Sequence, residues 1–462
     1  MKRFFEREKA FLAPIFSIAL PLALQNLIAS SLNMIDTVLI GGLGQSSIAA
    51  VGLANQLFFL LNLFTFGINS GTAIFTAQFW GQKDIKNIRR VMGIGLFTGI
   101  TAGLVFSLVA WLLPKQVLSI FSNDPYVVRL GAGYLRIIAT SYVITTVSFC
   151  LAFVLRSTGE VMLPVKVSGM ALVLNTFLNY AMIYGKFGFP RMEMAGSAWA
   201  TVIARTVELA TLLYVIYRWA LVPAARLREI VDFSREFVKR FFKTTIPVIL
   251  NESLWALGVM MFTVVYARMG TAIVAGVNIF STIERISMVI FFGLAQACAV
   301  SVGNRIGAGD EETALGFAKR YSLIGPVLGL MIGGLLTLGA GALLSIFHVP
   351  AATLAISRQI LYIFVLVLPF KVFNLINIVG ILRSGGDTKF SLFLDTAGLW
   401  IFAVPLAFLA GLVWRLPPPM VYLLACSEEV FKFFFGVWRL RSGKWVNNLT
   451  HTMRAAVRES ES

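Results

Sequence analysis

Long apolar runs separated by short polar stretches repeat along the whole chain. Each run has 18 or more residues, enough for a helix to cross the ~30 Å hydrocarbon core of a bilayer. The pattern therefore predicts an all-α polytopic membrane protein with twelve transmembrane helices. The predicted spans are 12–40, 46–80, 91–113, 130–155, 164–184, 197–218, 244–268, 273–302, 321–346, 358–382, 390–413 and 420–437.

The second half of the chain repeats the first. Pro21 recurs as Pro247, and the segment 67–84 recurs as 293–310 at the same offset along the chain. Each copy contains six spans, an even number, so both copies enter the membrane in the same orientation. We expect two six-helix bundles related by a pseudo-two-fold axis along the membrane normal, with a cleft that opens to either side.

This duplication divides the chain into four parts. We expect an N-lobe at 1–219, a basic cytoplasmic linker at 220–243, a C-lobe at 244–437 and a basic cytoplasmic tail at 438–462. Within the linker, Phe233, Phe237, Phe241 and Phe242 recur at helical spacing among basic residues. That pattern predicts an amphipathic helix on the membrane surface.

Composition supports this class and explains the strong positive charge. Hydrophobic residues make up 58% of the 462 positions and charged residues only 13%, against about 25% charged in soluble domains. The net charge of +17 comes mainly from alternate loops, which is the positive-inside bias of membrane proteins. We therefore expect a multi-pass protein of the cell membrane with both termini in the cytoplasm. Its basic groups would meet lipid headgroups and not nucleic acid, and we expect a monomer.

The residues needed for an intramembrane enzyme are missing from the sequence. Its two histidines, His348 and His451, lie at a span end and in the tail. The spans contain no Ser/His dyad, zinc-protease motif or paired-aspartate pattern. We expect a protein that is not an enzyme, with no cofactor and no metal site other than one for a coupling Na⁺.

Three polar residues of the N-lobe lie inside predicted spans, where contact with hydrocarbon is unfavourable for polar side chains. Asp36 lies in an apolar span, and an ionisable group at that depth costs ~2.5–3.5 kcal/mol on insertion scales, which indicates function. Asn175 and Asn179 are four residues apart and share one helix face. Carboxylate and amide oxygens suit Na⁺. The alternatives are a protonated carboxyl group, which also couples to an ion gradient, and amides that only join helices.

The C-lobe spans carry a second set of charged residues. Glu252 follows the kinking residue Pro247, as in a moving segment. Glu284 and Arg285 are sequence neighbours that point ~100° apart, so we expect them to pair with other helices. Lys371 needs an anion, and Glu252 is the first candidate. For Arg285, and for Arg205 and Glu208 in the N-lobe, we expect structural ion pairs.

Short motifs in a fixed order resemble a known family, from about residue 15 to 438. They are Pro21 with Met34-Ile-Asp36, Gly81-Gln-Lys-Asp84, Arg156-Ser-Thr-Gly159, Ala198-Trp-Ala-Thr201, Gly303 to Gly309, and Leu382-Arg-Ser-Gly-Gly-Asp-Thr388. On a duplicated twelve-span frame, this order resembles the multidrug and toxic-compound extrusion (MATE) family. The stretch from Asn175 to Asn179 resembles its NorM-like branch.

This resemblance implies a fold, an activity and a set of site residues. It implies two six-helix bundles arranged as a V, and secondary active efflux of cationic, amphipathic drugs in exchange for Na⁺ or H⁺ by alternating access. It assigns the cation site to Asp36, Asn175, Asn179 and Thr201. It also assigns a C-lobe acid to Glu252, although Lys371 stands near where the branch commonly places a second acid. Glu252, Glu284, Arg285 and Lys371 are thus candidates for a C-lobe coupling or substrate site.

One other transporter class fits a duplicated bundle. A lipid-linked oligosaccharide flippase of related fold would often have extra spans and a strongly cationic cavity. Twelve spans with few intramembrane basic residues favour the drug antiporter over this alternative.

Overall fold

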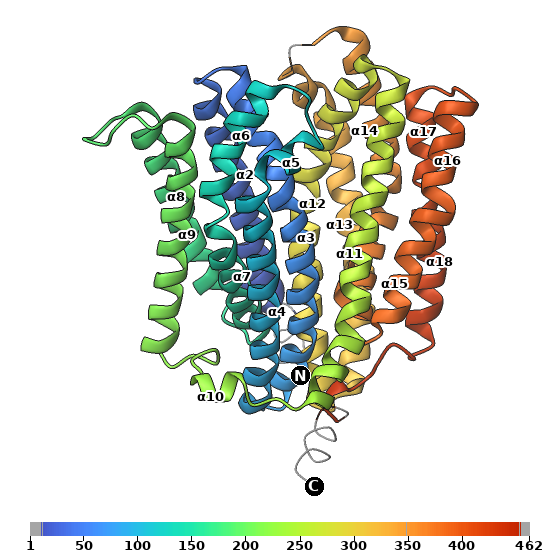
Figure 1. Cartoon of the computed structure of the whole chain (residues 1–462). Helices are drawn as coiled ribbons and strands as arrows, with labels where there is room; N and C mark the ends of the chain where they lie inside the picture. Colours follow the sequence, from blue (N-terminus) through green and yellow to red (C-terminus); the bar gives the residue numbers. More distant parts are fainter. Residues whose placement is uncertain (1–10, 12, 348, 452, 454–462) are drawn as a thin grey trace. The chain divides into compact units, whose positions relative to one another are not determined.

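The computed structural model describes residues 11, 13–347, 349–451 and 453, and every regular element in them is helical (Figure 1). This confirms the predicted all-α polytopic fold. The chain divides into two compact units with a border between Phe242 and Lys243. The N-unit comprises residues 24–242, and the C-unit comprises residue 243 onward together with the segment before Leu24. The described residues before Leu24 thus group with the second half of the chain and not with the first.

The N-unit contains the end of α2 and the helices up to α10. Their bounds are α2 Leu20–Gly41, α3 Gln45–Gly81, α4 Ile85–Leu112, α5 Pro114–Ser119, α6 Pro125–Ile138, α7 Ser141–Ser157, α8 Met162–Tyr184, α9 Glu193–Arg218 and α10 Leu227–Ile230.

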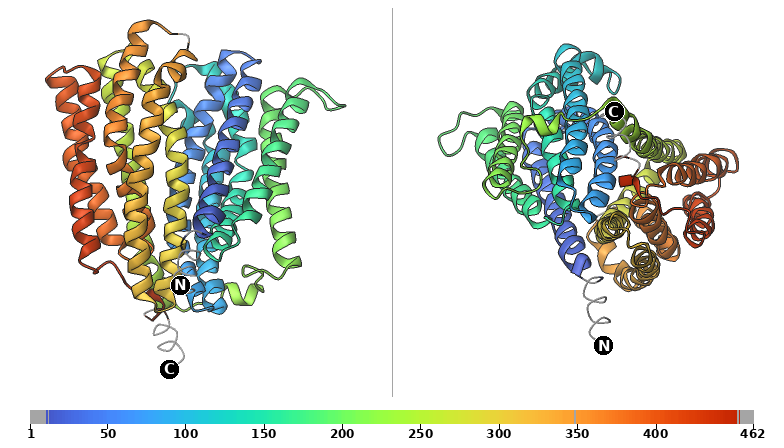
Figure 2. Two further views of the ribbon diagram at one scale, coloured as in Figure 1. Left: turned by 180° about the vertical axis from the view of Figure 1, so that it is seen from behind. Right: turned by 90° about the horizontal axis from the view of Figure 1, so that it is seen from below.

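The C-unit contains the remaining helices, four of which are π-helical segments. Their bounds are η1 Ile15–Ala19, α11 Arg235–Met269, α12 Thr271–Gly307, α13 Glu311–Ser345, α14 Ala351–Leu375, η2 Ile376–Leu382, α15 Thr388–Ala397, η3 Gly398–Ala403, α16 Val404–Phe408, η4 Leu409–Val413, α17 Pro418–Ala425 and α18 Ser427–Arg441. The first residues of α11 belong to the N-unit. The view from below in Figure 2 (right) shows the long helices of each unit nearly end-on.

Most of the predicted spans are single helices long and apolar enough to cross a membrane. Among the described residues, ten helices meet this description, and the bent pair α6 and α7 makes an eleventh. That pair occupies the predicted span 130–155 and bends by 50° at its break. The predicted span 420–437 is divided between α17 and α18, which have 8 and 15 residues. The second of these carries Glu428, Glu429 and Lys432.

The internal repeat is visible in the helices themselves. Helices α3 and α12 each have 37 residues, and their first residues, Gln45 and Thr271, are as far apart in the sequence as Pro21 and Pro247. Each helix follows a glycine with positive φ, 107° at Gly44 and 138° at Gly270. Only glycine adopts such angles without strain.

The next helix of each copy begins with the same cap. Asp84 accepts a hydrogen bond from Asn87 N at 3.2 Å at the start of α4. Asp310 accepts one from Thr313 N at 3.2 Å at the start of α13. An aspartate in this position satisfies a backbone N–H at the start of a helix. The predicted duplication therefore extends to individual backbone and capping positions.

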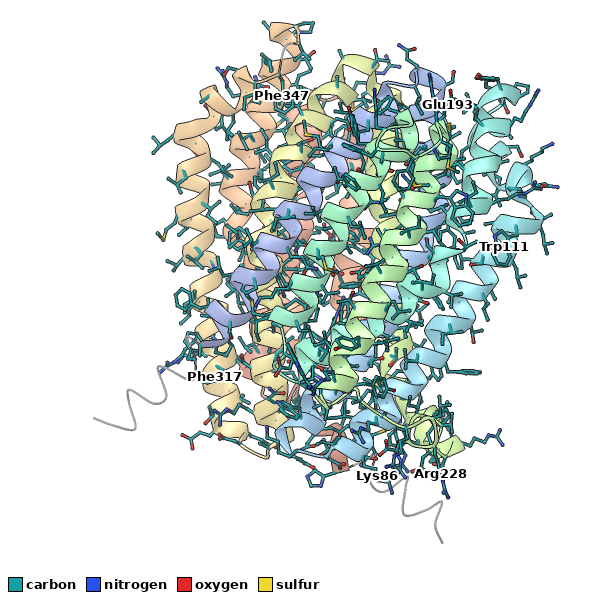
Figure 3. All side chains as sticks on the ribbon, turned by 90° about the vertical axis from the view of Figure 1, so that its left-hand side faces the viewer. Lys86, Trp111, Glu193, Arg228, Phe317 and Phe347 are labelled. Atoms are coloured by element: carbon teal, nitrogen blue, oxygen red, sulfur yellow. The ribbon has the colours of Figure 1, made fainter. Side chains whose placement is uncertain are left out.

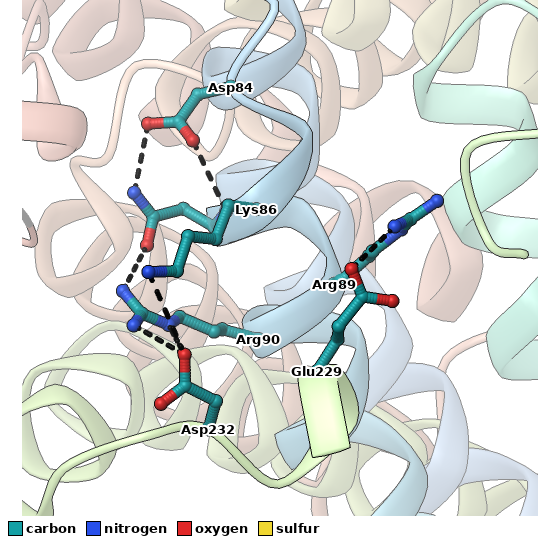
Figure 4. A network of polar contacts seen from close by, with 7 residues as sticks. Asp84, Lys86, Arg89, Arg90, Glu229 and Asp232 are labelled. Atoms are coloured by element: carbon teal, nitrogen blue, oxygen red, sulfur yellow. Dashed lines mark hydrogen bonds and ion pairs between the residues drawn. The ribbon is translucent and has the colours of Figure 1, made fainter. Parts of the chain in front are cut away.

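A polar network fixes the linker to α4 (Figure 4). Arg90 donates to Asp232 at 2.6 Å, and Arg89 donates to Glu229 at 2.8 Å. The hydrogen bond from Arg90 lowers the pKa of the Asp232 carboxyl group. The backbone N–H of Arg226, with help from Arg89, lowers the pKa of Glu229. Both carboxylates are therefore ionised at neutral pH and hold the linker on the end of α4.

The phenylalanines of the linker do not form a helix on the membrane surface, so that prediction is wrong. Helix α11 begins at Arg235 and continues into the next span. Phe237 and Phe241 are both 0% exposed, and Phe241 packs on Phe75 of α3 with ring centroids 5.5 Å apart. Two of the four phenylalanines are thus buried by protein, while Phe233 and Phe242 are partly exposed.

Described residues from the first and the last part of the chain pack within the C-unit. Phe11 packs on Phe317 and Tyr321 of α13. Beyond α18, Trp445 is fully buried, and Asn447 N donates to Gly385 O at 2.8 Å. The residues after 438, predicted as a tail, therefore include a packed segment.

Candidate functional site

The N-unit brings together the four residues assigned to a cation site. Asn179 donates through Nδ2 to Asp36 Oδ1 at 2.9 Å and to Asn175 Oδ1 at 3.2 Å. Asn175 in turn donates to Thr201 Oγ1 at 3.2 Å. Helices α2, α8 and α9 each contribute at least one residue. One hydrogen-bonded chain thus connects Asp36 with both amides and the hydroxyl group.

Close helix packing holds this arrangement in place. At Gly196 on α9, an added Cβ would lie 2.6 Å from Met182 O of α8, so only glycine allows the two helices to approach this closely. Tyr184 at the end of α8 donates to Leu39 O of α2 at 2.7 Å. The contact of Gly196 sets the distance between α8 with the two amides and α9 with Thr201, and that of Tyr184 sets the distance between α8 and α2 with Asp36.

The charge at Asp36 is not balanced by a basic group in the described part of the chain. Its half-buried carboxylate forms no ion pair with any residue that the structure describes, and it accepts a hydrogen bond from Asn179. Asn179 is 1% exposed, and its Oδ1 has no hydrogen-bond partner among the described residues. A carboxylate oxygen, two amide oxygens and a hydroxyl group are hard donors of the kind that bind Na⁺. A proton on Asp36 would neutralise the same charge.

The candidates in the C-unit are paired differently from the sequence prediction. Glu252 accepts a hydrogen bond from Arg383 Nη1 at 2.6 Å, and Lys371 forms its ion pair with Glu284. The predicted pairing of Lys371 with Glu252 is therefore wrong. Arg285 is exposed and forms no ion pair with a described residue, so its expected pair is absent there. In the N-unit, Arg205 and Glu208 form the expected structural pair at 2.6 Å.

Sequence reasoning missed most of the buried charges in the C-unit. Lys432 contacts Asp395 at 2.6 Å and Glu428 at 2.9 Å. Asn251, with its amide oriented to satisfy both neighbours, connects Asp395 with Arg383. The C-unit charge network consists of Glu252, Glu284, Lys371, Arg383, Asp395, Glu428, Glu429 and Lys432. Three charged residues within one predicted span, 420–437, were the signal that could have revealed it.

Three residues mark the two ends of the N-unit. Lys86 and Arg228 lie at one end, and Glu193 lies at the other (Figure 3). The site around Asp36 lies closer to the Glu193 end, because Asn179 is near the end of α8 at Tyr184. The site therefore lies toward the end of the N-unit opposite to Lys86 and Arg228.

Comparison with known families supports both the duplication and the predicted class. The family model MatE matches the chain twice, at residues 21–181 and 247–409. The two matches begin at Pro21 and Pro247, the pair of prolines that marks the internal repeat.

Individual relatives and solved structures cover nearly the whole chain. The probable multidrug resistance protein NorM of Thermotoga maritima is 26% identical over 93% of this chain and 92% of its own. The probable multidrug resistance protein YoeA of Bacillus subtilis is 27% identical over 84% of each. An outward-facing multidrug resistance MATE family transporter of the MOP superfamily aligns with a TM-score of 0.82 at 19% identity, over 93% of this chain and 96% of its own. A MOP superfamily transporter from Pyrococcus furiosus aligns with a TM-score of 0.83 at 18% identity, with the same coverage.

These structures share the fold, and the two relatives carry the name of probable multidrug resistance proteins. Together with a family model that matches in both halves, they decide the class of this protein. The chain belongs to the MatE family of multidrug efflux transporters.

Proposed function

We propose that this protein is a secondary active antiporter that exports cationic, amphipathic small molecules in exchange for Na⁺ or H⁺. The observation that carries the proposal is the carboxylate of Asp36, held by Asn179 and without a basic partner among the described residues. An unneutralised acid inside an apolar helix bundle is costly unless an ion binds it during the working cycle.

Binding of the ion changes what Asp36 requires from its neighbours. As a free carboxylate it needs the Asn179 amide as a donor. Once Na⁺ or a proton neutralises it, that bond weakens, and α2 and α8 adopt a different packing. The ion thereby shifts the population between two conformations of an alternating-access cycle.

A single ion provides enough energy for useful export. One charge that moves inward across 100 mV releases ~2.3 kcal/mol. For an exported compound without net charge this corresponds to roughly a forty-fold concentration ratio, since about 1.4 kcal/mol is a factor of ten. For a singly charged cation, one-for-one exchange moves no net charge, and the concentration gradient of the ion drives export. We place the end with Lys86 and Arg228 in the cytoplasm of a cell-membrane protein that works as a monomer, because basic residues collect on the cytoplasmic side.

The lipid-linked oligosaccharide flippase remains the alternative activity for this bundle. The relatives named as multidrug resistance proteins favour drug efflux over it. A lipid-flipping assay run beside the efflux assay would separate the two activities.

The test is transport by purified protein in proteoliposomes, with ethidium as the exported probe. Gradients of pH and of Na⁺ are imposed separately, and we expect one of them to drive efflux. Asp36→Asn should abolish coupled efflux and remain folded, whereas Glu311→Gln, at an exposed acid, should transport normally. Unchanged gradient-driven efflux by Asp36→Asn would refute the proposed site.

A further inference from the structure

The internal repeat places one arginine at the same position of each copy. Arg156 and Arg383 both stand in the sequence Leu-Arg-Ser, directly after a predicted span. Three residues later, Gly159 and Gly386 have positive φ angles of 95° and 77°, which glycine adopts without strain. The two arginines therefore occupy equivalent places in the N-unit and in the C-unit.

In the C-unit, this arginine has an acid as its partner. Arg383 is 3% exposed and donates through Nη1 to Glu252 at 2.6 Å. Its Nη2 donates to the amide oxygen of Asn251, also at 2.6 Å, in the amide orientation that satisfies both neighbours of that asparagine. One carboxylate and one amide oxygen thus hold the guanidinium group, and its buried charge is balanced.

In the N-unit, the amide is kept and the acid is missing. Gln25 and Asn26 correspond to Asn251 and Glu252 by the offset of the repeat. Arg156 donates through Nη2 to Gln25 Oε1 at 3.0 Å. Asn26 carries no charge, and Arg156 forms no ion pair with any residue that the structure describes. Its Nε is buried and has no hydrogen-bond partner there.

One acid of the N-unit acts on Arg156 through its charge, but other donors already occupy it. This acid is Glu208 of α9. Ser168 donates to its Oε1 and Arg205 donates to its Oε2, each at 2.6 Å. Two guanidinium groups therefore share one carboxylate, which leaves one excess positive charge when all three groups are ionised. A buried charge without a counter-ion is costly, and this cost favours the binding of an anion.

The surroundings of Arg156 suit an anion with an apolar part. Phe149, Phe153 and Arg156 are four and three residues apart on α7 and share one helix face. The guanidinium carbon of Arg156 lies 5.7 Å from the centre of the Phe153 ring, and that of Arg205 lies 6.0 Å from the centre of the Phe149 ring. All four side chains are partly exposed. An apolar chain or ring can therefore lie on the phenylalanines while its oxyanion meets the guanidinium group.

We propose that Arg156 binds the oxyanion of an amphipathic molecule, which supplies the negative charge that Glu252 supplies to Arg383. The planar guanidinium group matches phosphate and carboxylate oxygens, and the N–H at Nε is available as a donor. Two sources offer this chemistry: the phosphate of a membrane phospholipid and a carboxylate on an exported compound. Binding at Arg156 does not rest on the proposed antiport function, whereas a role of the second source in export does.

The test is thermal unfolding of the full-length protein in uncharged detergent with two pairs of probes. Phosphatidylglycerol is compared with a diacylglycerol of the same chains, and norfloxacin is compared with its ethyl ester, which lacks the carboxylate. A ligand that binds the folded state raises the unfolding temperature. We expect at least one anionic probe to raise it more than its counterpart does. A rise with phosphatidylglycerol identifies a lipid phosphate as the ligand, and a rise with norfloxacin identifies a carboxylate.

Variants at two positions locate the binding. Arg156→Gln should weaken binding of the stabilising probe about tenfold or more, because a hydrogen bond between charged groups is lost. Asn26→Glu covers the case in which Arg156→Gln does not fold. It gives the first copy the acid of the second, so the new carboxylate should pair with Arg156 and abolish the effect of the probe. Asn26→Gln, which adds no charge, and Arg218→Gln, at an exposed arginine, should respond like the wild type.

The proposal is overturned if neither anionic probe stabilises the protein more than its counterpart does. It is also overturned if a folded Arg156→Gln protein binds the probe as tightly as Arg218→Gln does, or if Asn26→Glu responds as strongly as Asn26→Gln, since the anion would then bind elsewhere. Normal coupled efflux by Asp36→Asn would refute the proposed function and leave this measurement intact.

Discussion

At the scale of single residues, Asn179 connects Asp36 to the rest of the N-unit through hydrogen bonds. One Nδ2 group donates to both Asp36 and Asn175, so a change in charge on Asp36 alters the hydrogen bonds of α8 directly. Because Asn175 also donates to Thr201, the change extends to α9. Under the proposed mechanism, one ionisation event would thereby affect three helices.

This cluster could be predicted from the sequence, whereas the partner of Lys371 could not. The face shared by Asn175 and Asn179 follows from the helical period alone. Asp36 stood out as an ionisable group in an apolar span, and the family resemblance added Thr201. The pairing of Lys371 with Glu284 depends on how α12 and α14 are rotated and shifted against each other. No local pattern in the sequence specifies that register.

The hydroxyl group of Tyr184 provides a test of how α2 is held. Tyr184→Phe removes the hydrogen bond to Leu39 O, 2.7 Å long, and should lower the free energy of unfolding by about 1 kcal/mol. Thermal unfolding in detergent measures this loss. Tyr214→Phe is the matched control, since Tyr214 is 69% exposed. Equal unfolding temperatures for the two variants would contradict the role of Tyr184.

At the scale of elements, the C-unit is built around buried ion pairs between helices. Lys432 of α18 joins Asp395 of α15, and Arg383 after η2 joins Glu252 of α11. The π-helix η2, Ile376–Leu382, has more residues per turn than an α-helix. It therefore rotates Arg383 away from the direction that a regular helix would give. This change of register explains why a residue predicted at a span end takes part in a buried pair.

Loss of Lys432 should damage the C-unit severely. Lys432→Met leaves Asp395 and Glu428 buried without their cation, and breaking such a pair costs about 3–5 kcal/mol. We expect a large fall in the thermal unfolding temperature, partly recovered by adding Asp395→Asn. Lys389→Met, at an exposed lysine, should unfold like the wild type. A Lys432→Met protein as stable as this control would show that the network is not needed for stability.

The attachment of the linker to α4 should depend on pH. The pKa of Asp232 is lowered from 3.8 by the hydrogen bond from Arg90. Its contribution is therefore complete above the unfolded pKa and is lost as pH falls through the folded pKa. A spin label at Val231→Cys, a position 66% exposed, should be ordered at neutral pH and become mobile only as the pH falls well below 3.8.

The same label provides its own control. In an Asp232→Asn background, it should be mobile already at neutral pH. A label whose mobility in this background matches that of the wild type would indicate that other contacts hold the linker.

At the scale of the whole molecule, the duplication accounts for most of what could be predicted. It gave the number of spans in each half, the constant offset between the copies and the equivalence of α3 with α12. It could not show that residues before Leu24 pack with the second half. The local sequence pattern does not reveal whether these residues bury more apolar surface against the first half or against the second half.

Equivalent positions in the two copies should respond alike to the same substitution. Gly44→Ala and Gly270→Ala both force a side chain into a positive φ, at a cost of about 1–3 kcal/mol each. Gly52→Ala is the control, because its Cβ would meet open space in a helix and should be neutral or slightly stabilising. The three unfolding temperatures measure this directly. A marked difference between Gly44→Ala and Gly270→Ala would mean that the two turns are not structurally equivalent.

The buried indole of Trp445 has a practical consequence for anyone who handles this protein. Its backbone oxygen lies so close to Gly385 that a Cβ there would come within 2.4 Å, and Asn448 donates to Ile306 O at 2.9 Å. Shortening the chain at the last long helix would leave a hole in the bundle and expose apolar surface to water. Purification tags and fluorescent fusions therefore belong after residue 453, where they leave the contacts of Trp445 and Asn448 intact.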